Sequence, residues 1–205
     1  SADTFTNNLH ADLRADYIIT NPPFNQKQWN SSVPDTDIRW SHGIPSEKNA
    51  NFAWIQHIIH HLSPKGVAGF VMANGSLTSN QNNEGNIRRE IIESGMVECI
   101  VSLPDRLFMN SGISACLWFL RKGRKNPNEV LLIDASEQGD MLTRTQRELD
   151  KEEVDHISSA YIEWQKMVKE IIGPEENAKT KEKDMFYIKK QLANTIPVKF
   201  ALKNQ

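Results

Sequence analysis

The chain has 205 residues, a formal net charge of −2 and 39% hydrophobic residues. This length is enough to bury a sizeable core, whereas the charge argues against a strong non-specific grip on nucleic acid by this chain alone. No apolar run approaches the roughly 20 residues of a membrane helix, no signal peptide is visible, and the two cysteines make no disulfide framework. These features predict a globular protein of the cytoplasm that does not bind membranes.

Strand and helix patterns alternate along the first two thirds of the chain. The predicted elements, in chain order, are a buried strand over 15–20, a long polar loop over 26–48, a helix over 49–62, a strand over 67–73, a helix over 84–93, and strands over 97–103, 114–120 and 130–133. This alternation is typical of an α/β fold with a parallel sheet. A loop rather than a helix joins the strand over 114–120 to its predecessor, so that strand is expected to enter the sheet antiparallel.

The last third of the chain is more highly charged. Residues 149–172 carry an apolar stripe that includes Val154, Tyr161 and Trp164, which predicts a long helix packed on the domain or on a partner. Residues 173–184 are typical of a flexible linker, and the segment from Met185 onward contains a short apolar run that we leave unassigned.

The most informative motif directly follows the first predicted strand, at Asn21-Pro22-Pro23-Phe24. Asn21 and Pro22 each precede a proline, which favours an extended backbone, and neither proline has an N–H. The motif therefore offers the side-chain carbonyl of Asn21 and the backbone carbonyl of Pro22 as acceptors, with the Phe24 ring as a stacking face. These groups suit an amino group carried on a flat base, placed where α/β sheets bind ligands. The alternative is a Pro-Pro turn that only ends a strand.

The motif resembles the catalytic Asn-Pro-Pro-Phe of the DNA methyltransferases that methylate amino groups. Further runs follow in the order seen in the modification (M) subunits of type I restriction systems, which methylate adenine N6. These runs are Asn51-Phe52-Ala53-Trp54-Ile55-Gln56-His57, Leu62-Ser63-Pro64-Lys65-Gly66-Val67-Ala68-Gly69-Phe70-Val71-Met72, Ile87-Arg88-Arg89, Leu103-Pro104-Asp105-Arg106-Leu107-Phe108 and Val130-Leu131-Leu132-Ile133-Asp134-Ala135-Ser136. The resemblance extends from about residue 12 to about residue 164.

The resemblance implies a Rossmann-like S-adenosylmethionine-dependent methyltransferase fold whose last strand is antiparallel. It also implies transfer of a methyl group from S-adenosylmethionine to an adenine flipped out of DNA, with a specificity subunit and a restriction subunit as partners. The resemblance further implies that residues 1–135 are the C-terminal half of the catalytic domain, that 136–172 are a helical extension and that 173–205 are a linker and tail. The ending typical of the family is not present, so the tail stays unassigned.

The glycine-rich turn that holds the cofactor in this family is absent, since no Gly-x-Gly occurs in the chain. Only about twenty residues precede Asn21, too few for the βα units that would carry this half of the site. We therefore interpret the chain as a fragment of a larger subunit, with the main cofactor motif outside it. The chain alone is expected to be inactive.

Several further residues are candidates for the site. The resemblance implies that Phe108 contacts the second face of the target base, with burial beneath a turn as the alternative. Asn74 and Ser76 follow the strand over 67–73 and are candidates to line the target pocket, although Asn74-Gly75 is also a turn signal. Asn51 and Phe52 are weak candidates for cofactor contact, because helix capping and core packing explain them equally well.

Other interpretations remain open. His57, His60 and His61 have no acidic or cysteine ligand nearby in sequence, so we predict no metal site. An RNA or protein-glutamine methyltransferase with an Asn-Pro-Pro-aromatic loop is an alternative, although those enzymes commonly have Tyr where this chain has Phe24. A second alternative is a non-catalytic scaffold that binds partner subunits through residues 149–172.

Overall fold

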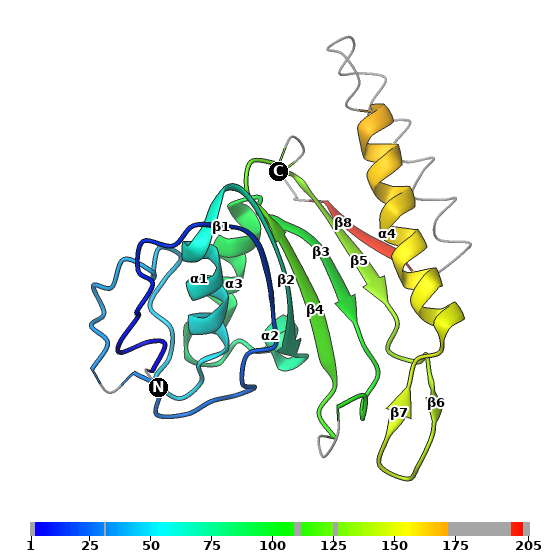
Figure 1. The fold of residues 1–205 in the computed structure, drawn as a ribbon, viewed down its shortest axis with the longest axis horizontal. Coiled ribbons are helices and arrows are strands. Elements are labelled where there is room, and N and C mark those ends of the chain that lie inside the picture. Colours follow the sequence, from blue (N-terminus) through cyan, green and yellow to red (C-terminus); the bar gives the residue numbers. More distant parts are fainter. Residues whose placement is uncertain (1–2, 31, 109–111, 125–126, 172–197, 203–205) are drawn as a thin grey trace. The chain divides into compact units, whose positions relative to one another are not determined.

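The computed structural model of the chain describes residues 3–30, 32–108, 112–124, 127–171 and 198–202 (Figure 1). Contacts divide the chain into two units. Unit 1 comprises residues 1–97 with 117–124, and unit 2 comprises residues 98–116 with 125–205. In unit 1 the strands β1 (Ala15–Thr20), β2 (Leu62–Ala73) and β4 (Ala115–Arg121) are neighbours in that order. In unit 2 the order is β3 (Val97–Ser102), β5 (Glu129–Asp134) and β8 (Val198–Leu202), and β4 carries residues of both units.

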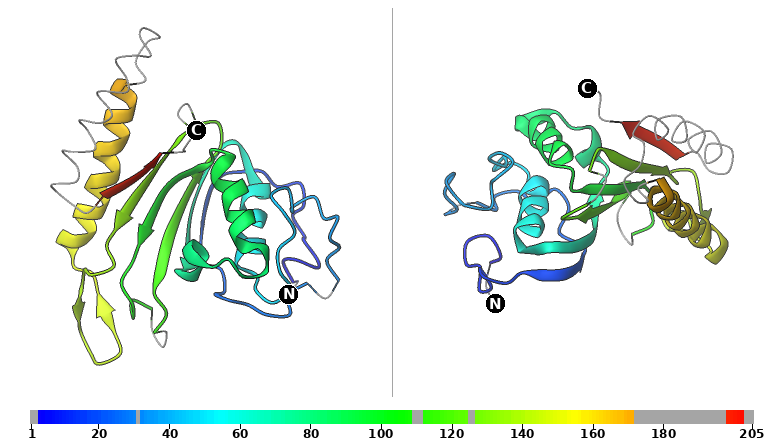
Figure 2. Two further views of the ribbon diagram at one scale, coloured as in Figure 1. Left: turned by 180° about the vertical axis from the view of Figure 1, so that it is seen from behind. Right: turned by 90° about the horizontal axis from the view of Figure 1, so that it is seen from above.

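Unit 1 is built on a parallel pair of strands, β1 (Ala15–Thr20) and β2 (Leu62–Ala73). Helix α1 (Asn51–His61) lies against this pair, as Figures 1 and 2 show. The helical spacing of Phe52, Ile55 and Ile59 puts all three on the buried face of α1. The helix ends just before Ser63-Pro64, and the chain enters β2 immediately. The predicted helix and strand are thus confirmed, with β2 starting earlier than expected.

Two more helices of unit 1 follow β2. The short α2 spans Gly75–Thr78, and α3 spans Glu84–Glu93 as the sequence predicts. Gly95 ends α3 with a φ of +76°, a left-handed conformation that glycine adopts without strain. On α3, Ile87 and Ile91 are fully buried.

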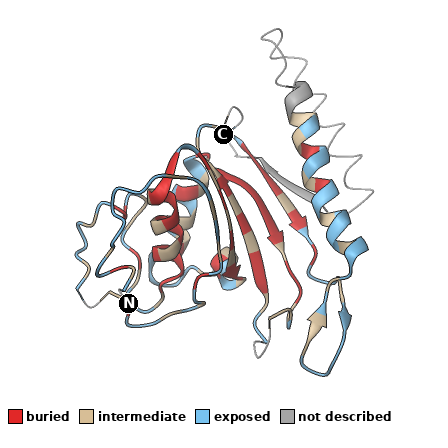
Figure 3. Cartoon of the chain, viewed as in Figure 1, coloured by how far each residue is buried: buried red, intermediate tan, exposed pale blue. Residues whose placement is uncertain are grey.

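The predicted burial of β1 is wrong. Tyr17 is 80% exposed and Ile19 is 93% exposed, whereas β2 alternates buried and half-buried residues over most of its length. The physical reason is that side chains alternate along β1: Ile18 and Thr20 lie on the side of α1, whereas Tyr17 and Ile19 point to the opposite face and are exposed. The colouring in Figure 3 shows the buried residues gathered on α1 and on strands other than β1.

In unit 2, β3 (Val97–Ser102) runs parallel to β5 (Glu129–Asp134), with Cys99 opposite Leu131. Strand β8 (Val198–Leu202) adds to β5 in the antiparallel sense. This strand lies in the tail that the sequence left unassigned, and a two-stranded ribbon of β6 (Asp140–Met141) and β7 (Arg147–Glu148) was not foreseen either. Residues 173–184, the predicted linker, lie outside the described part, and the predicted domain boundaries stay predictions.

Helix α4 spans Lys151–Ile171 and packs on its own unit along β5 (Figure 1). Ala160 and Trp164 are buried, and the Tyr161 hydroxyl donates to Oε2 of Glu98 at 2.8 Å. A reciprocal cap starts the helix, because the Glu153 N–H donates to Asp150 Oδ1 and the Asp150 N–H donates to Glu153 Oε2. The part of the apolar stripe around Tyr161 and Trp164 therefore serves intramolecular packing, one of the two uses that the sequence allows, whereas Val154 is exposed.

The same substitution, isoleucine to alanine, made once in β1 and once in α3 tests the difference in side-chain burial between these two elements. Ile87→Ala should lower the free energy of unfolding by about 2–5 kcal/mol, because it empties a fully buried position. Ile19→Ala removes the same atoms from an exposed side chain and should change it by about 0.5 kcal/mol or less. Urea unfolding followed by far-UV circular dichroism measures both. Equal losses would mean that β1 is covered in solution.

Candidate functional site

The Asn21-Pro22-Pro23-Phe24 motif begins directly after β1. Because β1 is parallel to β2, with Thr20 opposite Phe70, this motif and Asn74 after β2 both follow the carboxyl ends of adjacent parallel strands. Asn21 and Pro23 are exposed, Pro22 is buried and Phe24 is half-buried. The structure therefore places the motif where the sequence predicts it, at the ligand-binding edge of a parallel sheet.

The chain turns sharply after Phe24 and is tied to the start of α1. Asn25 has a φ of +52°. Its N–H donates to Oδ1 of Asn51 at 3.0 Å, and Nδ2 of Asn51 donates back to Oδ1 of Asn25 at 2.9 Å. The backbone of the next residue is held as well, because the Ala50 N–H donates to the Gln26 carbonyl at 2.9 Å. The residues after the motif are thus attached to a buried helix.

The two weak cofactor candidates are both buried. Asn51 is 2% exposed and uses its side-chain amide on Asn25, and Phe52 is 1% exposed in the core. Their described contacts serve the loop and the core, and cofactor contact by either residue stays a prediction.

The candidates for the target pocket differ in their surroundings. Asn74 is half-buried, and its Oδ1 atom is buried without a hydrogen-bond partner among the described residues. Ser76 is fully buried, and its hydroxyl accepts a hydrogen bond from Nε1 of Trp118 at 3.2 Å. Phe108 belongs to unit 2 and is half-buried in the loop after β3. Base contact by these three residues stays a prediction.

The long loop over 26–48 contributes to the core, which the sequence did not indicate. Trp29 and Trp40 are buried in a cluster with Phe5, and the Trp29–Phe5 ring centroids lie 4.8 Å apart. Gln56 of α1 is fully buried and is hydrogen-bonded to the loop backbone. Its Nε2 donates to the Gly43 carbonyl at 2.8 Å, and its Oε1 accepts from the His42 N–H.

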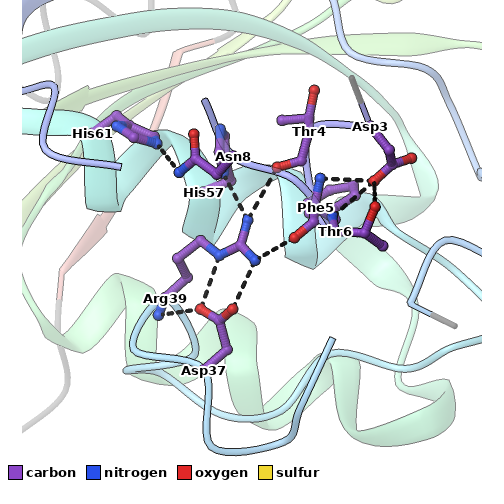
Figure 4. Close-up of polar contacts among 9 residues, drawn as sticks. All are labelled: Asp3, Thr4, Phe5, Thr6, Asn8, Asp37, Arg39, His57 and His61. Carbon is purple, nitrogen blue, oxygen red and sulfur yellow. Dashed lines mark hydrogen bonds and ion pairs between the residues drawn. The ribbon is translucent and has the colours of Figure 1, made fainter. Parts of the chain in front are cut away.

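A buried arginine connects this loop to the N-terminal segment (Figure 4). Arg39 is 6% exposed and forms a bidentate ion pair with Asp37, with Nη2–Oδ2 at 2.7 Å and Nε–Oδ1 at 2.8 Å. Its Nη2 also donates to the Phe5 carbonyl at 2.7 Å, and its guanidinium lies 5.1 Å from the Trp40 ring centroid. The hydrogen bonds from Arg39 hold the pKa of the Asp37 carboxyl below its ordinary value. A buried charge of this kind stays ordered because it is paired and fully bonded.

His57 of α1 faces the same arginine. Nη1 of Arg39 lies 3.3 Å from Nδ1 of His57, and because a guanidinium can only donate, Nδ1 accepts. Burial, together with the neighbouring His61 and Arg39, lowers the pKa of His57 to about 3. His57 is therefore neutral at physiological pH.

The histidines show no metal-binding arrangement. Nδ1 of His61 lies 3.0 Å from the Leu13 carbonyl and Nε2 lies 3.1 Å from Nδ2 of Asn8, so protein groups occupy both nitrogens. Within the described ranges, no three His, Cys, Asp or Glu side chains are grouped so as to hold a metal ion.

A cavity of about 410 Å³ lies in unit 1 between the N-terminal segment, β1 and α1. Its walls include Leu9, Leu13, Ile18, Trp54 and Ile58. No Asp or Glu is among its described lining residues, so it offers no carboxylate for a ribose. The chain also has no Gly-x-Gly turn.

Comparison with known proteins agrees with this fold. The structure resembles the crystal structure of the methyltransferase subunit of a type I restriction-modification system from Streptococcus thermophilus, with a TM-score of 0.72 and 30% identity over 78% of this chain and 34% of that one. The fold is thus the Rossmann-like α/β fold of S-adenosylmethionine-dependent methyltransferases. The model of the N-6 DNA methylase family matches residues 1–196, and the chain belongs to this family.

Two curated relatives are methylase subunits of type I restriction enzymes. The HindI methylase subunit of Haemophilus influenzae is 47% identical over 166 residues, which are 80% of this chain and 37% of that protein. The MjaIX methylase subunit of Methanocaldococcus jannaschii is 38% identical over 163 residues, 76% of this chain and 29% of that protein. The chain thus spans about a third of the length of the curated relatives it matches.

The depressed pKa of His57 predicts a loss of stability in weak acid. The unfolded chain binds a proton near the ordinary pKa of 6.5, whereas the folded chain binds it only near 3, so the stabilisation is complete above pH 6.5 and is lost as the pH falls toward 3. At pH 4.5 we expect a loss of about 2 kcal/mol from this residue. His57→Gln keeps an acceptor for Arg39 and should show a shallower decline between pH 6.5 and 4.5.

The measurement is the urea midpoint at several pH values for the parent chain and for His57→Gln. His10→Gln, at an exposed position of the same unit, is the control and should follow the parent. His42 and His60 also have lowered pKa values, because burial disfavours their charged forms, and their share of the pH dependence should persist in both variants. A His57 variant with the parental pH dependence would contradict the assignment.

Proposed function

We propose that this chain supplies the amine-binding side of a DNA adenine-N6 methyltransferase subunit in a type I restriction-modification system. The observation that carries the proposal is the position of Asn21-Pro22-Pro23-Phe24 at the carboxyl end of β1, in a chain of the N-6 DNA methylase family. Two hydrogen-bond acceptors and an aromatic ring follow one another at this edge, which suits an exocyclic amino group on a planar base.

The reaction needs two hydrogen-bond acceptors for the amino group of adenine, and it does not need a general base. Adenine N6 is a poor nucleophile because its lone pair is delocalised into the ring. In the proposed mechanism, the Asn21 side-chain carbonyl and the Pro22 backbone carbonyl each accept one amino hydrogen, which favours a tetrahedral geometry at N6 and directs its lone pair. S-adenosylmethionine supplies the methyl group, and the remaining work of the protein is alignment for in-line displacement, which can contribute several kcal/mol.

The target adenine must leave the duplex stack before N6 is accessible, at a cost of a few kcal/mol. We assign Phe24 to one face of the flipped base, since its aromatic ring follows Asn21 within the same four-residue motif. Asn74, whose buried Oδ1 has no partner among the described residues, is a candidate acceptor for the base, whereas the hydroxyl of the buried Ser76 is bonded to Trp118.

The cofactor and the partners are part of the same proposal. The main S-adenosylmethionine site is assigned to sequence outside this chain, because the chain has no Gly-x-Gly turn and no Asp or Glu is among the described lining residues of the cavity in unit 1. DNA, a specificity subunit and a restriction subunit are the proposed partners. No helix in the described ranges has the length and apolar character needed to cross a membrane.

A non-catalytic scaffold is the second candidate. The observation in its favour is the same missing cofactor turn. Against it, part of the stripe of α4 that would bind a partner is used within its own unit, through the buried Trp164 and the Tyr161–Glu98 hydrogen bond, although Val154 is 48% exposed.

The test is a fusion in which this chain replaces the matched segment of the Haemophilus influenzae relative. The fusion is produced with the specificity subunit of that system in a host that lacks adenine methylation, and N6-methyladenine in the DNA is measured by mass spectrometry. Methylation is expected, and its absence in a fusion that binds S-adenosylmethionine and DNA would favour the scaffold. Asn21→Ala should lower kcat by at least about 1,000-fold, since it removes one of two acceptors that act in the transition state.

Binding of the cofactor separates the role of Asn21 from a general loss of structure. Because Asn21 acts on the amine, Asn21→Ala should leave the affinity of the fusion for S-adenosylmethionine within about twofold, as measured by calorimetry. Parallel loss of methylation and of cofactor binding would contradict the assignment.

Phe24→Ala should weaken the capture of the flipped base. With 2-aminopurine at the target position, the parent fusion should raise the fluorescence on binding, because the base leaves the stack, and the variant should show a smaller change. Phe119→Ala, at a half-buried phenylalanine of β4, is a matched control for the loss of a ring elsewhere. An unchanged signal in Phe24→Ala would show that its ring does not hold the base.

A further inference from the structure

We propose that Asn51 is a positioning residue for methyl transfer, which acts by holding Asn25 and thereby fixing the backbone that presents Asn21 and Phe24. This inference rests on the proposed function and adds to it a residue that does not touch the substrate. We call the paired side chains of Asn25 and Asn51 the amide clasp.

The clasp is a closed pair of hydrogen bonds between residues that are distant in sequence. The Asn25 N–H donates to Asn51 Oδ1 at 3.0 Å, and the Asn51 side chain donates to Asn25 Oδ1 at 2.9 Å. Both polar ends of the Asn51 amide are therefore used, and the residue is only 2% exposed. Asn25 itself is exposed, so water competes for its side of the pair, whereas loss of the Asn25 contacts would leave the buried amide of Asn51 unsatisfied.

The Asn51 side chain does not serve as an ordinary helix cap. The residue at the N-cap position of α1 is Ala50, which makes no side-chain cap, and the first turn contains no acidic residue. The Asn51 N–H is satisfied by Oδ1 of Asn49 at 3.0 Å. The amide of Asn51 is therefore directed at the loop that follows the motif, and not at the N-terminus of its own helix.

The conformation of Asn25 explains why a clasp is needed. A φ of +52° is a left-handed conformation that costs most residues roughly 1–2 kcal/mol, although asparagine adopts it more readily than others. This turn reverses the chain directly after Phe24. The bonds to Asn51 offset the cost and select one conformation of the turn.

The motif between the two attachment points is stiff. Its start is fixed at Thr20 by the β1–β2 ladder, and its end is fixed at Asn25 by the clasp. The prolines lock their own φ angles and restrict the residues before them, so few internal torsions are free. A shift at Asn25 therefore moves the Pro22 carbonyl and the Phe24 ring together. Alignment errors of about 1 Å can cost about 100-fold in rate.

The first measurement is made on this chain alone, by NMR hydrogen exchange of backbone amides. The Asn25 N–H should be protected in the parent chain and should exchange near the solvent-limited rate in Asn51→Leu, while amides of β2 stay protected. Asn51→Asp still accepts from the Asn25 N–H but no longer donates to Asn25 Oδ1, so it should retain intermediate protection. Asn86→Ala, which removes an exposed amide from α3, should leave Asn25 protected.

The second measurement uses the fusion described above. Asn51→Leu should lower kcat by about 100-fold with the KM for S-adenosylmethionine changed by no more than about twofold, and Asn51→Asp should recover part of kcat. Adding Asn25→Gly to Asn51→Leu should cause little further loss, because the two residues act as one unit. A residue that only stabilises the fold would lower the fraction of active protein without this dependence on Asn25.

The two measurements separate this inference from the function on which it rests. If the parent fusion fails to methylate DNA, the proposed function is contradicted, and loss of Asn25 protection in Asn51→Leu still tests the clasp. Protected Asn25 in Asn51→Leu, an unchanged kcat in that variant, or losses from Asn25→Gly and Asn51→Leu that multiply would each overturn the proposal.

Discussion

The burial of α1 against the β1–β2 pair is the interaction on which the rest of unit 1 depends. This helix is attached to three separate segments along its length. Its first residues hold Asn25 and Gln26 after the motif, Gln56 in its middle holds the loop at His42 and Gly43, and His61 at its end contacts the N-terminal segment. Because the apolar face of α1 is fully packed, these polar contacts have a rigid base, which a loop of this length does not otherwise possess.

The long loop is ordered by polar groups that are costly to bury. Arg39 and Asp37 lose most of their hydration, and a hydrophobic pair of similar volume could be as stable or more so. The guanidinium, however, joins three chain segments at once, because it reaches Asp37 of the loop, the Phe5 carbonyl of the N-terminal segment and His57 of α1. Such directional bonds specify one arrangement of the segments, which apolar contacts alone do not. A neutral His57 is part of this arrangement, since a charged ring would repel the arginine.

Much of the fold could be predicted from the sequence, because most elements have strong periodicity and clear ends. The spacing on α1 and α3, the Ser63-Pro64 stop and the turn at Gly95 all appear in the structure as expected. The burial of β1 could not be judged, since an apolar run of this length does not show which faces of the strand are covered by other elements. The ribbon of β6 and β7 is too short to give an alternating pattern, and β8 depends on pairing with β5 far away in sequence.

In the candidate site too, features encoded by neighbouring residues could be predicted from the sequence, whereas contacts between distant residues could not. Acceptors and ring lie within four consecutive residues, and proline restricts them through covalent geometry alone, so Asn21 to Phe24 could be recognised without any tertiary contact. The partner of Asn51 could not, because an asparagine near a helix start is compatible with capping, packing or binding until its amide is seen bonded to Asn25. The one local signal was that Asn25, a residue tolerant of left-handed backbone, directly follows the motif. A stiff candidate segment that ends in a left-handed asparagine needs a group that holds that asparagine, and the structure provides it from α1, a helix whose apolar face is buried.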